Sequence, residues 1–216
     1  MSEFPFQHLG WFIAAGLLLN LTPGPDVLYI VTQSLRRGAR VGMVAGLGIT
    51  AGCFVHVAAA AVGIGALLAS SALVFSLLKW LGAAYLLWMG ARMLLSQQAD
   101  EQPLPTAPAV PQEMKSVFFG GFTTNVLNPK VALFFLAFVP QFIAPEAPNK
   151  ALAFVLLGTL FNLNSVAINV AYALLSAALA RRMSAVQRAM HAMERVAGLM
   201  FIAFGLRLAL TEQPQL

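Results

Sequence analysis

The stretch NLTPGPDVLYI, residues 20–30, lies inside an apolar segment that is long enough to cross a lipid bilayer. It places Gly24 between Pro23 and Pro25, and Asp26 follows directly. Proline removes a backbone donor, and its ring clashes with the carbonyl four residues earlier, so a regular helix cannot continue through this stretch. The sequence therefore predicts a broken membrane helix with a carboxylate beside the break.

The broken backbone needs hydrogen-bond partners, because hydrocarbon supplies none. Pro23 and Pro25 free the carbonyls near Leu19 and Leu21, and such groups are tolerated in a membrane only beside protein or a watery cavity. We therefore expect the break to face the interior of the protein. The helical segment after the break begins with N–H groups of partial positive charge, which can hold a carboxylate.

The composition is that of an integral membrane protein. Of the 216 residues, 59% are hydrophobic and 10% are charged, whereas soluble domains carry roughly 25% charged residues. The formal net charge is +5, but the basic residues cluster beside apolar segments, so nucleic acid is not an expected partner. Cys53 is the single cysteine, which excludes an intrachain disulfide and a cysteine-based metal or redox pair.

Six apolar segments predict six transmembrane helices, since about 20 apolar residues span a bilayer. Their expected ranges are 9–35, 41–68, 73–95, 116–142, 151–179 and 195–210. A stretch with four prolines separates the third helix from the fourth. The predicted organisation is a three-helix unit at residues 1–96, a cytoplasmic proline-rich linker at 97–115 and a second three-helix unit at 116–216.

The two units resemble each other at their helix breaks. In the segment NVLNPKV, residues 125–131, setting Pro129 on Pro25 places Lys130 on Asp26. Because three helices are an odd number, the second unit must enter the membrane from the opposite side. We therefore expect an all-α integral membrane fold of two inverted three-helix repeats, as in many secondary transporters. Chance similarity among Gly- and Leu-rich segments is the alternative.

Asp26 and Lys130 are charged residues inside membrane segments. A lone charge at the bilayer centre costs roughly 3 kcal/mol on insertion scales, and these two residues have opposite signs. We expect them to lie in one polar cavity near the midplane and to pair directly or through water. The alternative is that the prolines only kink the helices and that Asp26 caps the second half of the first one.

The second and fifth helices add polar residues. Gly42, Gly46, Gly48 and Gly52 favour close helix packing, and His56 continues the stripe of Gly52 as a packing residue or a proton carrier. In the fifth helix four polar residues share one face, which is either a set of interhelical hydrogen bonds or a cavity wall. These residues are Asn162, Ser165, Asn169 and Tyr172.

The basic residues predict the orientation. Nine of the 13 Lys and Arg residues lie in or beside the first, third and fifth loops, which places those loops in the cytoplasm and both termini on the periplasmic or extracellular side. The basic stretch 181–195 also has Met183, Met190 and Met193 on one face. We expect it to be an amphipathic segment at the lipid surface, or a gate. The three histidines are far apart, so no metal site is expected.

Four segments resemble the lysine exporter (LysE) superfamily, and within it the homoserine/threonine resistance (RhtB) group. They are LTPGPDVLYIV, GLGITAGCFVHVAAAAVGIGALL, LKWLGAAYLLWMGARML and GGFTTNVLNPKVALFFLAFVPQFI. The resemblance implies an exporter of amino acids or related metabolites in the bacterial inner membrane, powered by the proton motive force. It carries over to Pro23, Gly24, Pro25, Asn128, Pro129 and Lys130.

The residues and the resemblance together suggest an amino-acid exporter without a cofactor that exchanges its substrate for protons by alternating access. The glycine stripe of the second helix could also serve a homodimer. The alternatives are a structural or regulatory membrane subunit that does not transport, and an exporter of another small ion or solute. No nucleophile–base pair or phosphate loop suggests an enzyme. The candidate transport residues are Asn20, Pro23, Gly24, Pro25, Asp26, His56, Asn125, Asn128, Pro129, Lys130, Asn162 and Asn169.

Overall fold

The computed structural model describes residue 6 and residues 8–69, 72–95, 113–144, 147–180 and 183–210. The helical elements are α1 (Leu9–Leu21), α2 (Pro25–Arg37), α3 (Ala39–Ala69), α4 (Ala72–Leu95), α5 (Met114–Val126), α6 (Pro129–Leu133), the π-helical turn η2 (Phe134–Phe138), the 3-10 turn η3 (Val139–Phe142), α7 (Lys150–Ala178) and α8 (Met183–Leu210). Within these segments the only β-type pairing is an isolated bridge between Phe6 and Ile143, so the all-α prediction is confirmed. The predicted linker lies outside the described residues up to residue 112.

Both predicted helix breaks are present. Pro25 opens α2 and Pro129 opens α6, each at the start of its helix, where the missing N–H would have no helical partner in any case. The axes bend by 50° between α1 and α2 and by 48° between α5 and the stretch Pro129–Phe142, which begins with α6. The expectation that the first and fourth apolar segments are interrupted is therefore confirmed.

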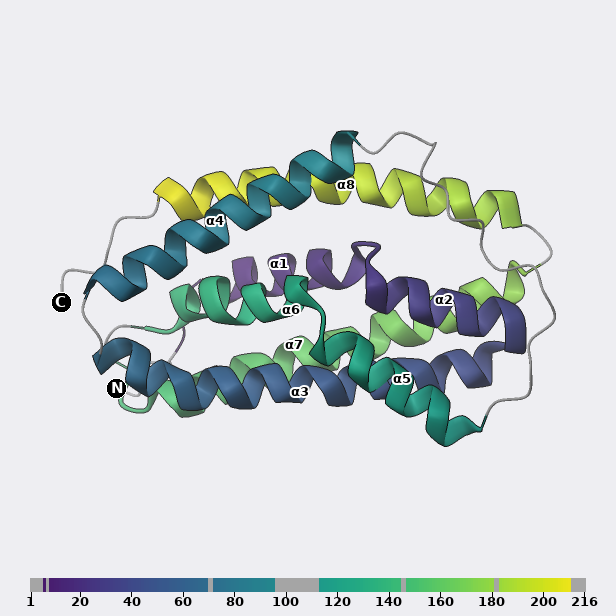
Figure 1. Ribbon diagram of the computed structural model, residues 1–216, viewed down its shortest axis with the longest axis horizontal. Coiled ribbons are helices and arrows are strands. Elements are labelled where there is room, and N and C mark those ends of the chain that lie inside the picture. The colour runs from purple at the N-terminus through teal and green to yellow at the C-terminus, as the bar shows by residue number, and fades with distance from the viewer. Residues whose placement is uncertain are drawn as a thin grey trace.

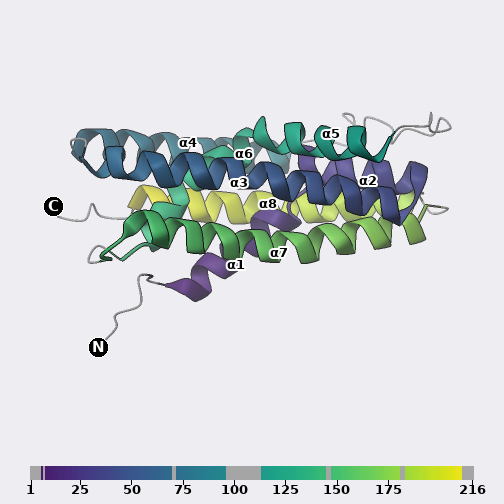
Figure 2. The same ribbon diagram turned by 90° about the horizontal axis from the view of Figure 1, so that it is seen from below.

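The helices form one elongated bundle (Figure 1). The bent pairs α1–α2 and α5–α6 run in opposite directions along the bundle, and α5 crosses α3. Their breaks lie beside each other, because Lys130 at the start of α6 donates to Leu19 and Thr22 at the end of α1. In the same view α4 and α8 lie together along one side, and α3 and α7 along the other. Seen from below, α3 and α7 lie in front of the rest (Figure 2). This arrangement surrounds the two breaks with helices.

Length and composition define the candidate membrane spans. The stretch Ala39–Gly63 of α3 and the whole of α7 are each long and apolar enough to cross a bilayer. Each bent pair also qualifies when it is counted as one span, which gives up to four spans in the described residues. The chain is thus a helical protein with candidate membrane spans, while the six-helix count and the inverted symmetry stay predictions.

The last helix differs from its prediction. It was expected to begin at Arg195, after a separate amphipathic segment on the lipid surface, but α8 runs without interruption from Met183 to Leu210. Met190 packs against Val27 and Val31 of α2. Met190 and Met193 of this segment therefore contact the protein, and the segment is continuous with the last helix where the prediction separated the two.

The glycines of α3 allow its neighbours to approach closely. A Cβ atom on Gly52 would lie 2.6 Å from the carbonyl oxygen of Phe122 in α5 and 3.0 Å from Cβ of Asn125. A Cβ atom on Gly46 would lie 3.0 Å from Cβ of Asn169 in α7. The glycine stripe thus has the packing role that its spacing predicted, and it brings α5 and α7 against α3.

Replacing Gly52 should test this contact. Gly52→Ala forces the backbone of α5 to move, because the nearest atom is a backbone carbonyl, and overpacking of this kind costs about 1–3 kcal/mol. We expect a lower thermal midpoint of the purified protein in detergent. Gly63→Ala is the matched control on the same helix, since a Cβ atom there would meet nothing within 4 Å. Equal midpoints for the two variants would contradict the close contact.

Candidate functional site

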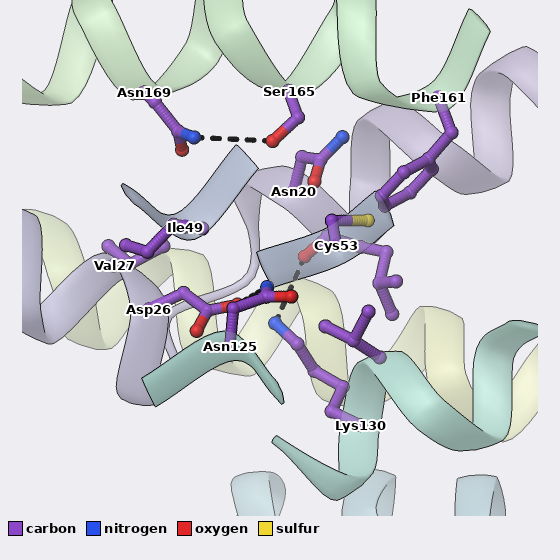
Figure 3. Close-up of a pocket in the computed structure, with 12 residues that line it drawn as sticks. Asn20, Asp26, Val27, Ile49, Cys53, Asn125, Lys130, Phe161, Ser165 and Asn169 are labelled. Carbon is purple, nitrogen blue, oxygen red and sulfur yellow. Dashed lines mark hydrogen bonds between the residues drawn. The ribbon is translucent and has the colours of Figure 1, made fainter. Parts of the chain in front are cut away.

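A small cavity lies where the two helix breaks meet, bordered also by α3 and α7 (Figure 3). Its volume is about 20 Å³, and one water molecule needs roughly 10–15 Å³. Of the predicted site residues, Asn20, Asp26, Asn125, Lys130 and Asn169 line it. The structure thus places residues of both helix breaks around one small cavity.

The carboxylate of Asp26 is held from the other half of the chain. Its Oδ2 atom accepts hydrogen bonds from Nδ2 of Asn125 at 2.8 Å and from Nδ2 of Asn128 at 3.0 Å. The Oδ1 atom is buried and has no hydrogen-bond partner, and the same is true of Oδ1 of Asn125. Two buried acceptors at this site are thus left without a donor.

Lys130 reaches the end of α1. Its ammonium donates to the carbonyl oxygens of Leu19 and Thr22, each at 3.1 Å, and the residue is only 7% exposed. Leu19 lies four residues before Pro23, so Lys130 binds a carbonyl that the proline leaves without its helical partner. An ammonium has three N–H groups, and these two bonds leave one for another acceptor.

The two charged residues do not form a direct ion pair. Asp26 and Lys130 both lie in the described part of the chain, and no contact of 4.0 Å or less joins their charged atoms there. Each instead binds the segment before the break of the other half: Asp26 binds Asn125, and Lys130 binds Leu19. Direct pairing, one of the two arrangements expected from the sequence, is not observed.

Two further carbonyls at the end of α1 also have side-chain donors. The hydroxyl of Thr22 donates to the Leu18 carbonyl at 2.6 Å, and the hydroxyl of Tyr172 in α7 donates to the Leu21 carbonyl at 2.8 Å. Leu21 lies four residues before Pro25, so Tyr172 binds the second carbonyl that the prolines free. The sequence analysis did not include Tyr172 in the site, although its place on the polar stripe was a signal.

Asn128 uses both ends of its side chain. Its Oδ1 atom accepts the backbone N–H of Lys130 at 3.0 Å and caps the N-terminus of α6, while its Nδ2 atom donates to Asp26. An asparagine at this position therefore stabilises the start of the helix and also orients the carboxylate. This gives a physical reason for the Asn-Pro-Lys order.

His56 touches the site through Asn125. Its Nε2 atom lies 2.9 Å from the backbone oxygen of Asn125, and a carbonyl only accepts, so Nε2 carries the hydrogen. The same oxygen also accepts the backbone N–H of Asn128 at 2.9 Å, so His56 supplies a second donor at the end of α5. His56 is not among the residues that line the cavity, so its contact is that of a residue that positions Asn125.

The polar stripe of α7 faces the charged residues across the cavity. Figure 3 shows Ser165, Asn169 and Asn20 on one side and Asp26, Asn125 and Lys130 on the other. Asn169 donates to Ser165 at 3.2 Å. Asn162 belongs to the same stripe and is 2% exposed, but it does not line the cavity itself. Ser165 and Asn169 thus border the cavity, and the stripe also forms interhelical hydrogen bonds, from Asn169 to the Gly46 carbonyl and from Tyr172 to the Leu21 carbonyl.

The double role of Asn128 predicts that the same substitution, asparagine to aspartate, lowers stability at this helix cap but not at another one. Asn128→Asp keeps the capping oxygen but places a second carboxylate beside Asp26, and an uncompensated buried charge costs roughly 3 kcal/mol or more. Asn149→Asp is the matched control, because Asn149 caps α7 at an exposed position through Leu152 N–H. We expect a lower thermal midpoint for the first variant only. A similar change in both would show that Asn128 acts as a cap alone.

Comparisons with known proteins agree with this picture. A family model described as LysE type translocator matches residues 17–212. The leucine efflux protein of Salmonella typhimurium (strain LT2) is 27% identical over 208 residues, which cover 96% of this chain and 97% of that protein. The homoserine/homoserine lactone efflux protein of the same strain is 33% identical over 172 residues, covering 79% and 82%. No solved structure shows a significant match.

Proposed function

Because this chain belongs to the family of LysE type translocators, we propose that it exports an amino acid or a closely related small metabolite across the bacterial inner membrane. The names of its relatives include leucine efflux and homoserine/homoserine lactone efflux. The observation that carries the proposal is the pair of buried acceptors without donors, Oδ1 of Asp26 and Oδ1 of Asn125, in the same cavity as the ammonium of Lys130.

The charges of the cavity match those of a zwitterion. The ammonium of the substrate would donate to the free oxygens of Asp26 and Asn125, which otherwise remain buried without partners at a cost. Its carboxylate would accept the remaining N–H of Lys130, close to Gly24 and the partly positive start of α2. An amino acid could thus leave water without leaving an unpaired charge in the protein.

The size of the cavity indicates a closed state. A volume of about 20 Å³ has room for about one water molecule and not for an amino acid. The site must therefore enlarge before a substrate binds, and the breaks after Leu21 and Val126 are the places where the helices can change their bend. We place alternating access at these two hinges, which the opposite directions of α1–α2 and α5–α6 support.

Asp26 offers a simple basis for exchange with protons. A proton and a substrate ammonium would both bind at its free Oδ1 atom, so the two cannot occupy the site together. Mutually exclusive binding at one carboxylate makes the release of one favour the binding of the other. We therefore assign the coupling to Asp26, with His56 acting on it through Asn125.

Transport by variants of the two charged residues is the test. Purified protein in proteoliposomes should release labelled amino acids faster when a pH gradient drives protons the opposite way. We expect Lys130→Met to abolish this efflux and Asp26→Asn to reduce it strongly, because each removes half of the match to a zwitterion. Lys150→Met at the start of α7 is the matched control and should transport normally.

Each other outcome has a separate meaning. Normal efflux by Lys130→Met would place the site elsewhere, and flux of no amino acid in the panel would favour a subunit that does not transport. Efflux at the same rate with and without the pH gradient would refute the proton antiport but not the export of amino acids. The double variant with Asp26→Asn should be inactive but better folded than the worse single one, since a single change strands a buried charge.

We also propose that the loops at the end of the bundle where α2 ends and α8 begins face the cytoplasm, with both termini on the other side. The support is the distribution of nine of 13 basic residues, and α7 begins at the opposite end of the bundle (Figure 1). In this orientation the proposed linker 97–115 is cytoplasmic, like the loop after α2.

Single-cysteine labelling checks this orientation. With Cys53, the single native cysteine, replaced, Arg37→Cys and Arg188→Cys should react with a membrane-impermeant maleimide only from the cytoplasmic side. Lys150→Cys should react only from outside. Glu101→Cys in the linker should follow the first pair, and Gln213→Cys near the C-terminus should follow Lys150→Cys. Cytoplasmic labelling of residue 213 would overturn the orientation.

A further inference from the structure

Two side chains donate to carbonyls that occupy the same position at the two helix breaks. The hydroxyl of Tyr172 in α7 donates to the Leu21 carbonyl at 2.8 Å, and Nε2 of His56 in α3 lies 2.9 Å from the Asn125 carbonyl oxygen. Each of these carbonyls lies four residues before the proline that opens the next helical segment, and that proline has no N–H to offer it. At both breaks a side chain from another helix therefore supplies a donor at this position.

The two bonds lie on opposite sides of the cavity. Cys53 of α3 and Asn169 of α7 line it, and His56 and Tyr172 each follow three residues later, about one helical turn further along. The helices α3 and α7 run in opposite directions (Figure 1). His56 therefore lies toward the end of the bundle where α3 ends. Tyr172 lies toward the other end, where its hydroxyl also contacts Sδ of Met193 in α8 at 3.7 Å.

Each bond stabilises the closed form of its own side. A path from the cavity to one end of the bundle requires the broken helix to separate there from α7 or from α3, because the closed cavity holds only about one water molecule. On one side this separation breaks the bond from Tyr172 to Leu21, and on the other it breaks the bond from His56 to Asn125. Water that enters the open path replaces the lost donor, so the bond favours the closed form by its net contribution alone.

We propose that Tyr172 and His56 are positioning residues for transport, each of which holds the path from the cavity to one end of the bundle closed. This inference rests on the proposed alternating access and adds the side chain that acts on each side. The two contributions are unequal, since the Asn125 oxygen keeps the backbone N–H of Asn128 as a donor, whereas the carbonyl bound by Tyr172 lacks its helical donor. Loss of the Tyr172 hydroxyl should therefore favour opening more than loss of the His56 imidazole.

Access to Cys53 from the two faces of the membrane tests the proposal. Cys53 is the single cysteine, lines the cavity and is only 2% exposed, so a charged methanethiosulfonate reaches it only when one side opens. The reagent is added to right-side-out and to inside-out membrane vesicles, and the rate of Cys53 modification is followed by mass spectrometry. Labelling of Arg37→Cys and Lys150→Cys, each with Cys53 replaced, identifies the face at each end of the bundle.

The expected effects are specific to one face. Tyr172→Phe keeps the ring and removes the hydroxyl, so modification of Cys53 should be about tenfold faster from the face of Arg37 and no faster from the other, because the rate follows the population of the open form. His56→Leu should raise the rate about threefold, only from the face of Lys150. His56→Gln should stay near the rate of the unaltered protein, because the glutamine Nε2 also donates and is as many bonds from Cα.

Tyr29→Phe is the matched control for the tyrosine. The Tyr29 hydroxyl also donates to a carbonyl, that of Val117 at 3.0 Å, but Val117 lies inside the continuous helix α5. This variant should leave both rates unchanged. In Tyr172→Phe, an unchanged rate, a rise from both faces or a rise from the face of Lys150 would overturn the inference, and so would an equal rise in Tyr29→Phe. Tyr172→Phe decides the question even if His56→Leu does not fold.

The labelling and the transport assays fail separately. Labelling from the wrong face or from both faces would overturn the roles of Tyr172 and His56, while the unaltered protein still exports amino acids. Flux of no amino acid through the unaltered protein would instead refute the proposed function, whatever the labelling rates of the variants.

Discussion

The structure depends on which donors bind the backbone carbonyls at the end of α1, where prolines break the helix. Four carbonyls there find donors that an unbroken helix would have supplied from its own backbone, and the donors come from the side chains of Thr22, Lys130 and Tyr172. Lys130 supplies two of these bonds from the other half of the chain. In a bilayer no solvent can replace it, so the break is stable only while α6 lies against it. The lysine is thus a structural partner of the break before it is a partner of any ligand.

The same relation holds in reverse at the second break. Asp26 at the start of α2 accepts hydrogen bonds from Asn125 and Asn128, which lie on either side of the break between α5 and α6. Because each break is held by a charged residue that follows the other, a change in one bend must alter the contacts of the second. This reciprocity gives the proposed alternating access a physical basis, since the two hinges cannot open independently.

The sequence predicted the parts of this structure that follow from local chemistry. The breaks at Pro25 and Pro129 were found because proline acts on its own helix, and the shared cavity followed from the cost of isolated charges. The partners of those charges depend on packing between distant helices, so the bond from Lys130 to Leu19 and the role of Tyr172 were not foreseen. The early start of α8 was missed because a methionine stripe looks alike whether lipid or protein covers it.

The unpartnered polar atoms bear on the proposed exchange. In the described residues, Oδ1 of Asp26 and Oδ1 of Asn125 are buried without partners beside a cavity with room for about one water molecule. Each such group costs about 1–3 kcal/mol, so the empty closed state is unfavourable as long as nothing binds them. A proton or a substrate at Asp26 removes part of that cost. In the proposed mechanism the protein passes through the closed state mainly when a substrate or a proton is bound. It would therefore carry the substrate in one direction and a proton in the other, which is an exchange.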